Sequence, residues 1–296
     1  MHSNSSSKSN QSYLKCRGMK FYSIIALVML LLNFHTAFSQ KEKKLNWKNV
    51  SVLVYTKNGK GYVHENIPSA VACVQKLSQQ HGFAIETSDD PAKFNVENLK
   101  KYSLLIFTST NNDVFDTDEQ RLAFRQYIEG GGGFVGIHSV VGTERNWVWF
   151  KMLLGGTFVW HPPYQRYKIV ALDAGHPSVS GLPKVWERED ECYFMKELYP
   201  GIHTVMAHDL STLNEKDKEK ITASAGFYVQ YYPAVWHQQF DGGKIWITAL
   251  GHNKLDYSEP VFVQHIFQGI KFVASQSSKP DFSKAYAKTK DEAVRY

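Results

Sequence analysis

A short apolar strand that ends in a histidine is the feature that most constrains how this chain can fold. Residues 131–139 read Gly-Gly-Gly-Phe-Val-Gly-Ile-His-Ser, and such a run is typical of a buried strand in a parallel sheet. Ligands of α/β proteins bind at the carboxyl ends of these strands, which is the position of His138. No Gly-x-Ser-x-Gly elbow is present and no cysteine lies nearby. We therefore expect a site built around histidine.

The segments around this strand alternate between strand and helix patterns. We expect strands at 50–55, 83–86, 103–108 and 133–138, and helices at 67–80 and 118–129. This order implies right-handed crossovers, so the prediction is an α/β fold with a doubly wound, mostly parallel sheet.

The strand and helix alternation stops near residue 155, and short strand patterns follow it. We expect these strands at 167–172, 203–207, 233–240 and 244–250, and a helix at 259–275. The last two strands are separated by Asp241-Gly242-Gly243, which predicts a hairpin. The fold would therefore carry an added β-rich C-terminal half.

The first 39 residues have the pattern of a secretory signal peptide. Met19-Lys20 precedes an apolar run from Phe21 to Leu32, and small residues stand near its end. Met19 is an alternative start of the protein. Because the run is short for a membrane span, we expect a secreted or periplasmic protein that has no membrane span after cleavage.

The charge of the chain gives no support for a nucleic-acid partner. The leader holds four basic and no acidic residues, so it accounts for most of the formal net charge of +6. No Lys/Arg cluster is interleaved with aromatic residues in the remainder. We therefore expect a small-molecule partner, and the oligomeric state is left open.

The remaining residues are enough for one large domain at 40–276. The Lys- and Asp-rich segment 277–296 is expected to be a loosely ordered tail. Two cysteines, Cys73 and Cys192, stand in the domain without the spacing of a redox pair or zinc site. Whether they pair in an oxidising compartment is left open.

Four histidines in loop positions are candidate functional groups. They are His64 after the first strand, His138, His161 in Trp-His-Pro-Pro, and His252 after the last strand. Loops that follow different parallel strands meet at one edge of the sheet, so these side chains are expected to converge. The alternative is that each bonds to the backbone of its own loop.

Two adjacent carboxylates, Asp190 and Glu191, follow a charged run. A carboxylate beside imidazoles suits general acid–base chemistry or completes a metal shell, whereas the alternative is a solvated acidic loop. No His-x-x-x-His spacing is present. The carboxylates and histidines together leave a divalent metal open as the cofactor, and the sequence indicates no other cofactor.

Trp147 and Trp160 follow His138 closely in the sequence. Aromatic rings at a pocket mouth stack on the apolar faces of sugars, although tryptophan is just as common in a core. We expect both side chains to bind substrate.

Several separated motifs resemble the ThuA-like, or trehalose-utilisation, family. They are Tyr55-Thr56-Lys57, Gly61-Tyr62-Val63-His64, Ile67-Pro68, Glu129 to His138, Leu154 to Phe158, His161-Pro162, His176-Pro177, Asp190-Glu191-Cys192-Tyr193 and Thr248 to His252. The resemblance runs from about residue 48 to residue 275.

The resemblance implies a class I glutamine amidotransferase-like, or flavodoxin-like, fold that lacks the amidotransferase cysteine. It also implies carbohydrate metabolism, in particular the handling of 3-keto-glucosides and keto-disaccharides. The expected catalytic residues are His64, His138, Glu191 and His252, and the expected substrate-binding residues are Thr56, Lys57, Trp147, Trp160, His161 and Asp190. Cys192 and His237 depart from the family pattern, and no role is transferred to His237.

The first hypothesis is a hydrolase, lyase or isomerase of glycosides or keto-sugars. In it His138 and Glu191 exchange protons, while His64 and His252 bind hydroxyls or a metal. The second is a non-catalytic carbohydrate-binding module. The third is an amidase or peptidase that uses Ser139 with His138, although adjacent residues at a strand end point apart.

Overall fold

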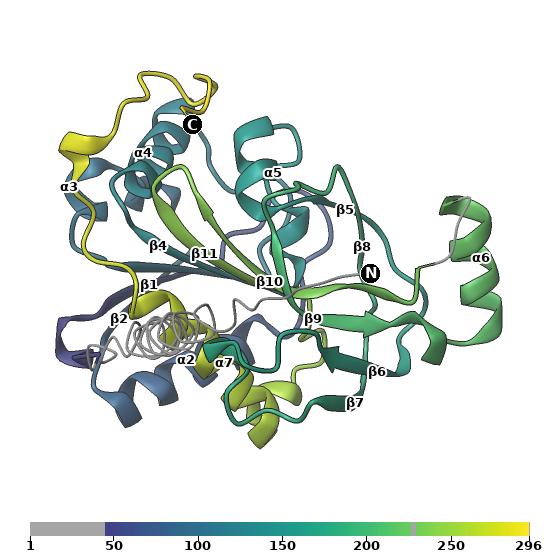
Figure 1. Ribbon diagram of the computed structural model, residues 1–296. Helices are drawn as coiled ribbons and strands as arrows, with labels where there is room; N and C mark the ends of the chain where they lie inside the picture. The colour runs from purple at the N-terminus through teal and green to yellow at the C-terminus, as the bar shows by residue number, and fades with distance from the viewer. Residues whose placement is uncertain (1–44, 226–228, 296) are drawn as a thin grey trace, which may run out of the picture. The chain divides into compact units, whose positions relative to one another are not determined.

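A nine-stranded mixed sheet lies at the centre of the fold (Figure 1). The strand order is β2-β1-β3-β4-β11-β10-β9-β6-β7. This computed structural model describes residues 45–225 and 229–295, and the side chains of 222–225 are not described. The expected signal peptide therefore lies outside the described residues. Among the described residues, no helix is long and apolar enough to span a bilayer.

The first five strands of this order are parallel. They are β2 (Ala84–Ser88), β1 (Ser51–Tyr55), β3 (Leu104–Thr108), β4 (Gly133–Ile137) and β11 (Gly243–Thr248). Every residue of β3 and β4 is buried, as expected for strands covered on both faces. The predicted α/β class and the four predicted N-terminal strands are confirmed.

The other four strands extend the sheet in an antiparallel arrangement. They are β10 (Tyr231–Phe240), β9 (His203–Asp209), β6 (Gln165–Ala171) and β7 (Val185–Asp190). β10 and β11 form the predicted hairpin, in which Asp241 and Gly242 both have positive φ, as a tight hairpin turn requires. A separate two-stranded sheet pairs β5 (Thr157–Trp160) with β8 (Phe194–Lys196).

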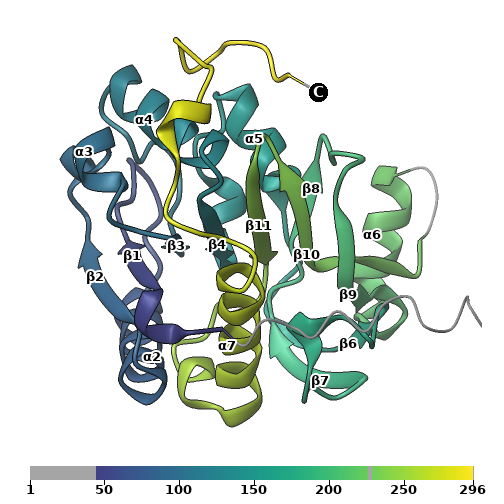
Figure 2. The ribbon, with the colours of Figure 1, turned by 60° about the vertical axis from the view of Figure 1, so that its left-hand side comes forward.

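Helices cover both faces of the parallel strands (Figures 1 and 2). α2 (Ile67–His81) and α7 (Pro260–Ala274) lie on one face, and α3 (Val96–Leu99), α4 (Asp118–Glu129) and α5 (Val148–Leu154) on the other. Side chains of β1 alternate between the two cores, since Val52 faces the α2 and α7 side and Leu53 the α4 side. The predicted helices at 67–80, 118–129 and 259–275 correspond to α2, α4 and α7.

Local sequence signals set where these helices begin. Thr117 and Gln120 form a reciprocal capping box at the start of α4. The Glu259 carboxylate accepts hydrogen bonds from the first two backbone N–H groups of α7. These caps satisfy donors that the helices themselves leave unpaired.

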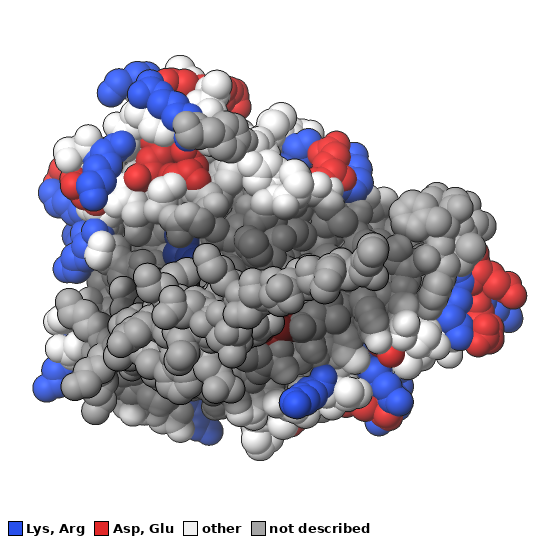
Figure 3. Space-filling view, viewed as in Figure 1, with Lys and Arg blue, Asp and Glu red and all other residues white. Residues whose placement is uncertain are grey.

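α6 (Glu215–Ala225) lies at one end of the unit, beside β9 (Figures 1 and 2). Its first two turns alternate acidic and basic residues from Glu215 to Lys220. Figure 3 shows the same mixing of charges around the margin of this face, where basic and acidic side chains lie side by side.

The C-terminal tail is not loosely held, which corrects the prediction for this segment. Its backbone passes over α4, where the buried Glu129 carboxylate accepts hydrogen bonds from the N–H groups of Tyr286 and Ala287. The buried Arg125 guanidinium donates to Glu129 and to backbone carbonyls of the tail. Ala287 is fully buried. The tail supplies the acceptors that a buried guanidinium requires.

Replacing the carboxylate that holds the tail is expected to destabilise the fold. In Glu129→Gln the amide N–H₂ would face either the two backbone N–H donors or the Arg125 Nε–H, and Arg125 would lose a buried ion pair. We expect the free energy of unfolding, measured by urea denaturation, to fall by about 3 kcal/mol, and trypsin to cut the tail faster. Glu292→Gln, at a half-buried position of the tail, is the matched control, with a smaller effect. Equal stability of wild type and Glu129→Gln would contradict this account.

Two buried histidines make stability fall in acid. His208 and His265 are fully buried, and burial lowers the pKa of each from 6.5 to about 3. The nearby Arg188 charge lowers the pKa of both further, whereas Asp190 acts in the opposite direction at His208. Between pH 6.5 and about pH 3 these two histidines bind protons in the unfolded chain but not in the native chain. The free energy of unfolding therefore decreases as the pH falls through this range.

This linkage is measurable by substitution. From pH 7 to pH 5 each such histidine should cost about 2 kcal/mol of unfolding free energy. His265→Gln should therefore be less stable than wild type at pH 7 but lose about 2 kcal/mol less on acidification. Gln276→Ala, which removes no titratable group and lies at an exposed position, should keep the wild-type pH dependence. Parallel curves for wild type and His265→Gln would show that the buried imidazole does not contribute.

Candidate functional site

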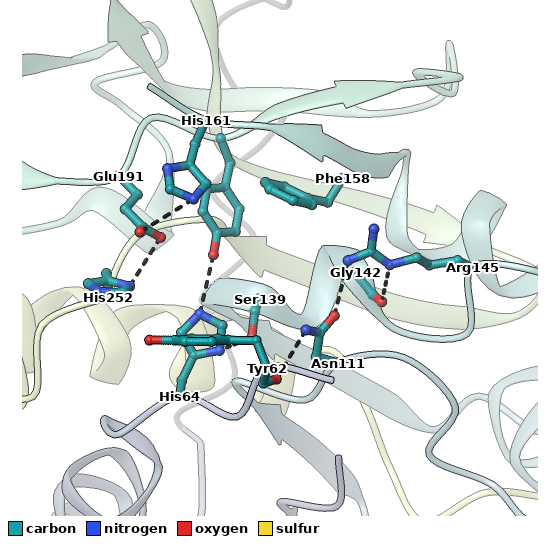
Figure 4. A pocket seen from close by; sticks show the side chains of 11 residues that line it. Tyr62, His64, Asn111, Ser139, Gly142, Arg145, Phe158, His161, Glu191 and His252 are labelled. Carbon is teal, nitrogen blue, oxygen red and sulfur yellow. Dashed lines mark hydrogen bonds and ion pairs between the residues drawn. The ribbon is translucent and has the colours of Figure 1, made fainter. Parts of the chain in front are cut away.

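A cavity of about 430 Å³ lies at the carboxyl edge of the parallel strands. Its volume is in the range of small-molecule sites. The lining residues come from loops after β1, β3, β4, β7 and β11 and from the β5/β8 sheet: Tyr62, His64, Asn111, Ser139, Gly142, Arg145, Phe158, His161, Glu191, Tyr193 and His252. Figure 4 shows Glu191 and His252 on one side, Asn111 and Arg145 on the other, and His64 and Ser139 between them.

His138 lies directly behind this lining, at the end of β4 and the start of the 3₁₀ turn His138–Gly142. Its backbone has φ of 55°, a conformation that is uncommon for a residue other than glycine. Its Nδ1 lies 3.1 Å from the Ala249 carbonyl. Because a carbonyl only accepts, Nδ1 carries the proton and Nε2 has a free lone pair.

Backbone strain is concentrated at this edge of the sheet. Four of the six described non-glycine residues with positive φ are Ser109, Asn112, His138 and Glu144. All four stand in the loops that follow β3 and β4. Such conformations cost about 1–3 kcal/mol each and persist where surrounding contacts hold them, often at functional sites.

His64 is held in the same tautomer by a different partner. Ser139 Oγ donates its only proton to the Thr110 carbonyl, 3.1 Å away. The oxygen must therefore accept from His64 Nδ1, which is also 3.1 Å away. His64 Nε2 is thus unprotonated and, like His138 Nε2, available to the cavity side.

The Tyr193 hydroxyl lies between these two imidazoles. It is 3.1 Å from His138 Nε2 and 3.5 Å from His64 Nε2. One hydroxyl proton can satisfy only one of the two lone pairs. Burial lowers the pKa of His64 to about 4 and the pKa of His138 well below 6.5, so both rings are neutral at pH 7.

Glu191 is surrounded by three imidazoles. Its Oε2 is 3.1 Å from His252 Nδ1 and 3.7 Å from His138 Nε2, and its Oε1 is 3.5 Å from His161 Nε2. Burial raises the pKa of Glu191, but the contact with His252 outweighs it, so the pKa is lowered. The contact with Glu191 raises the pKa of His252. The four histidines converge, as expected. Glu191 is 8 % exposed, so it is not a carboxylate of a solvated loop.

Asp190 is fully buried and positions the site rather than lining it. Its carboxylate accepts hydrogen bonds from the N–H groups of Gly251 (2.8 Å) and His252 (3.2 Å) and pairs with Arg188 (2.9 Å). The predicted substrate contact is therefore wrong for Asp190. It instead ties the end of β7 to the loop after β11.

Arg145 and Asn111 form the opposite wall. The guanidinium donates to the Gly142 carbonyl and to Asn111 Oδ1, and it lies 5.4 Å from the Phe158 ring centroid. A Cβ at Gly142 would lie 2.6 Å from Asn111 Oδ1, so glycine permits this close approach. Within the described residues Arg145 has no carboxylate partner. Its charge is free to attract an oxygen atom of a ligand.

Trp147 and Trp160 do not reach the cavity, which corrects the predicted substrate contacts. Trp147 is 2 % exposed, stacks on Trp149 and Phe150, and donates its indole N–H to a tail carbonyl. Trp160 stacks on Phe194 and lies beneath Lys220. Both side chains are packing residues.

The other predicted contacts divide between two hollows. His161 lines the cavity. Thr56 and Lys57 line an adjoining hollow that shares His64 with the cavity, and Lys57 is paired with Asp116. The exposed aromatic group at the cavity is Tyr62, which is 61 % exposed.

Asn111, Arg145, Phe158 and Tyr193 were not predicted as site residues. Asn111 and Arg145 follow β3 and β4, so the rule used for the histidines could have included them. Phe158 lies in β5 and Tyr193 directly precedes β8, and no local pattern indicated this small sheet. Cys73 and Cys192 are both buried and free, so they do not pair.

The arrangement suits two kinds of chemistry. A carboxylate in contact with three imidazoles can pass protons to and from a ligand. Alternatively, one ligand atom from each of His64, His138, Glu191 and His252 lies within 4.8 Å of the others, which could hold a metal ion.

The positioning role of Asp190 predicts a specific stability difference. Asp190→Asn should lower the free energy of unfolding by about 3 kcal/mol, because Arg188 loses a buried ion partner. Asp256→Asn is the matched control, since Asp256 also pairs with Arg188 but burial raises its pKa to about 6. We expect a smaller loss in this control. Urea denaturation followed by tryptophan fluorescence measures both, and equal losses would contradict the assignment.

Comparisons with known proteins identify similar sequences and folds. The model of the family described as ThuA, trehalose utilisation, matches residues 51–273. No curated protein matches the chain in sequence. The solved structure of a putative ThuA-like protein from Bacteroides uniformis has a TM-score of 0.64 at 20 % identity, over 83 % of this chain and 99 % of that one.

Two further solved structures share the fold. A putative ThuA-like protein from Parabacteroides merdae has a TM-score of 0.60 at 18 % identity, over 81 % of this chain and 100 % of that one. A cytoplasmic protein from Salmonella typhimurium has a TM-score of 0.53 at 12 % identity, over 78 % and 100 %. At these identities the similarity shows the fold alone.

Proposed function

Because the chain belongs to the ThuA, or trehalose-utilisation, family, we propose that it processes a glycoside or 3-keto-sugar by acid–base chemistry in this cavity. Family membership places the protein in carbohydrate metabolism. The observation that carries the reaction type is the Glu191 carboxylate on the cavity wall, in contact with His138, His161 and His252. Such a group can accept a proton and pass it on.

For a 3-keto-glucoside the proposed step is an elimination. The carbonyl at C3 acidifies the hydrogen on C2, and a base removes it. The electron pair forms the C1–C2 double bond while the C1–O bond to the aglycone breaks. The aglycone oxygen takes a proton, so the reaction needs no oxidant or reductant.

The residues take roles according to their positions. Glu191 and His161 line the cavity, so we assign to them the proton exchange with substrate. His138 is fully buried behind them, and its Nε2 acts by accepting a hydrogen bond from the Tyr193 hydroxyl, which it holds in place. Arg145, which has no carboxylate partner within the described residues, stabilises the negative charge that develops on the carbonyl oxygen.

A non-catalytic sugar-binding module is the competing proposal. It is favoured by Tyr62, whose largely exposed ring stands at the cavity and meets the His64 ring edge to face. An exposed aromatic face binds the apolar face of a sugar without any chemistry. The two proposals differ in what the loss of Glu191 should do.

Turnover of a 3-keto-glucoside with a chromogenic aglycone separates them. Glu191→Gln should lower kcat at least about 100-fold and change sugar binding, measured by calorimetry, only a few-fold. Tyr62→Ala should weaken binding with a smaller effect on kcat. Tyr231→Ala, an exposed tyrosine outside the cavity, is the control and should match wild type.

Two results would overturn the catalytic proposal. If the wild type binds glucosides and keto-glucosides but releases no aglycone and causes no epimerisation detectable by proton NMR, the protein is a binding module. If Glu191→Gln retains wild-type turnover, the carboxylate is not part of the chemistry.

We also propose that the protein acts outside the cytoplasm. The support is the sequence of residues 1–39, where a basic residue precedes a short apolar run. Mass spectrometry of the N-terminus of protein recovered from the periplasm or medium tests this. A mature chain that begins near Gln40 is expected, and an intact leader in the cytoplasm would contradict it.

A further inference from the structure

We propose that His64, His138, Glu191 and His252 form a binding site for one divalent transition-metal ion. The inference concerns the same cavity but does not rest on the identity of its substrate. It is argued from the protonation of the imidazoles, from unpaired buried atoms and from the spacing of the ligand atoms.

The first support is the fixed orientation of two imidazoles. His138 Nδ1 donates to the Ala249 carbonyl and His64 Nδ1 to Ser139 Oγ, each at 3.1 Å. Both Nε2 atoms are thereby left with a lone pair, and both lie near the Tyr193 hydroxyl, at 3.1 and 3.5 Å. Metal-binding histidines almost always donate their other N–H group to a carbonyl, carboxylate or water, which fixes the tautomer in this way.

The second support is a set of buried atoms without hydrogen-bond partners. Glu191 Oε2 and His252 Nδ1 are 3.1 Å apart, yet neither has an aligned hydrogen bond within the described part of the chain. Glu191 is more than nine-tenths buried. An unpaired buried carboxylate oxygen is costly, and a cation between it and the imidazoles would remove that cost.

The third support is spacing. Two ligand atoms at about 2.0–2.1 Å from one tetrahedral ion lie roughly 3.4 Å apart. The distances from Glu191 Oε2 to His252 Nδ1 and to His138 Nε2 are 3.1 and 3.7 Å, close to this value. All four candidate ligand atoms lie within 4.8 Å of one another, so side-chain rotations would have to bring the more distant ones closer. The Tyr193 hydroxyl, close to both Nε2 atoms, would then turn toward the ion or the cavity.

The ligand chemistry limits which ion is bound. Three imidazoles and one carboxylate suit zinc, cobalt, nickel or iron, whereas magnesium and calcium prefer oxygen ligands. Zinc is the expected occupant, since it binds imidazole and carboxylate together and needs no redox partner. His64, Glu191 and His252 line the cavity, so the ion would be accessible to a ligand there.

A second group of histidines provides a built-in control. His176, His203 and His237 stack on one another on the α7 side of the sheet, against Phe272. None of them lines the cavity. If purified protein binds zinc through accessible histidines alone, this stack would bind it as readily as the cavity does.

The test is metal binding without any sugar. The purified protein is stripped with a chelator and titrated with zinc, with cobalt as a spectroscopic probe and magnesium as a negative control. We expect one zinc per chain by elemental analysis after dialysis, and a visible cobalt spectrum of a four-coordinate site. Magnesium should not compete.

Substitutions locate the ion. His64→Ala and His252→Ala should each abolish stoichiometric binding, and His252 is half-buried, so its loss should leave the fold intact. Ser139→Ala, which removes the acceptor of the His64 N–H group, should weaken binding about 10–100-fold. The double variant His176→Ala/His237→Ala should bind zinc as wild type does.

The inference is overturned if the stripped protein binds no zinc at micromolar concentration. It is also overturned if binding survives His64→Ala and His252→Ala but disappears in His176→Ala/His237→Ala. Because no sugar is present, these results are independent of turnover. Zinc binding without turnover would reject the proposed reaction only, and turnover by a protein that binds no zinc would reject the metal site only.

Discussion

The site depends on one buried carboxylate, Asp190. β7 is the last strand of the nine-stranded sheet, far in strand order from β4 and β11, yet its end contacts the loop that follows β11. Asp190 makes this contact through two backbone N–H groups, and Arg188 neutralises its charge. The next residue is Glu191. The contact of Asp190 with the loop after β11 therefore places Glu191, the only carboxylate among the described residues that line this cavity, beside the histidines. Without it the parallel strands would present imidazoles with no acid beside them.

The histidines themselves owe their placement to parallel strands. β1, β4 and β11 run in the same direction, and the loops at their carboxyl ends bring His64, His138 and His252 together. His138 takes a strained backbone conformation at the end of a parallel strand, the position at which α/β-hydrolases carry a nucleophile elbow. Here the strain does not expose a nucleophile. With this backbone conformation, the unprotonated Nε2 of His138 lies 3.7 Å from the Glu191 carboxylate. Such a pair can move protons or bind a cation.

Much of the fold and part of the site could be predicted from the sequence, for identifiable reasons. The buried parallel strands and α4 have strong local patterns, and α4 begins at a capping box. β7 was missed because its buried positions alternate as Trp186, Arg188 and Asp190, so two of the three carry charges that only tertiary pairing allows to be buried. The convergence of the histidines followed from strand direction. The contact of Trp147 with the tail and the order of the tail could not be predicted, because Trp147 donates to the Lys290 carbonyl and Arg125 and Glu129 bind the tail backbone, all across more than a hundred positions.

The most direct test of the account is anomalous diffraction from a crystal of the zinc-loaded protein, measured at the zinc edge. The account predicts one strong peak between His64 Nε2, His138 Nε2, His252 Nδ1 and Glu191 Oε2, inside the cavity wall. A peak at the stack of His176, His203 and His237, or no peak in the cavity of a crystal grown with zinc, would contradict it. In that case any proton transfer in the cavity would depend on the imidazoles and the Glu191 carboxylate without a metal ion.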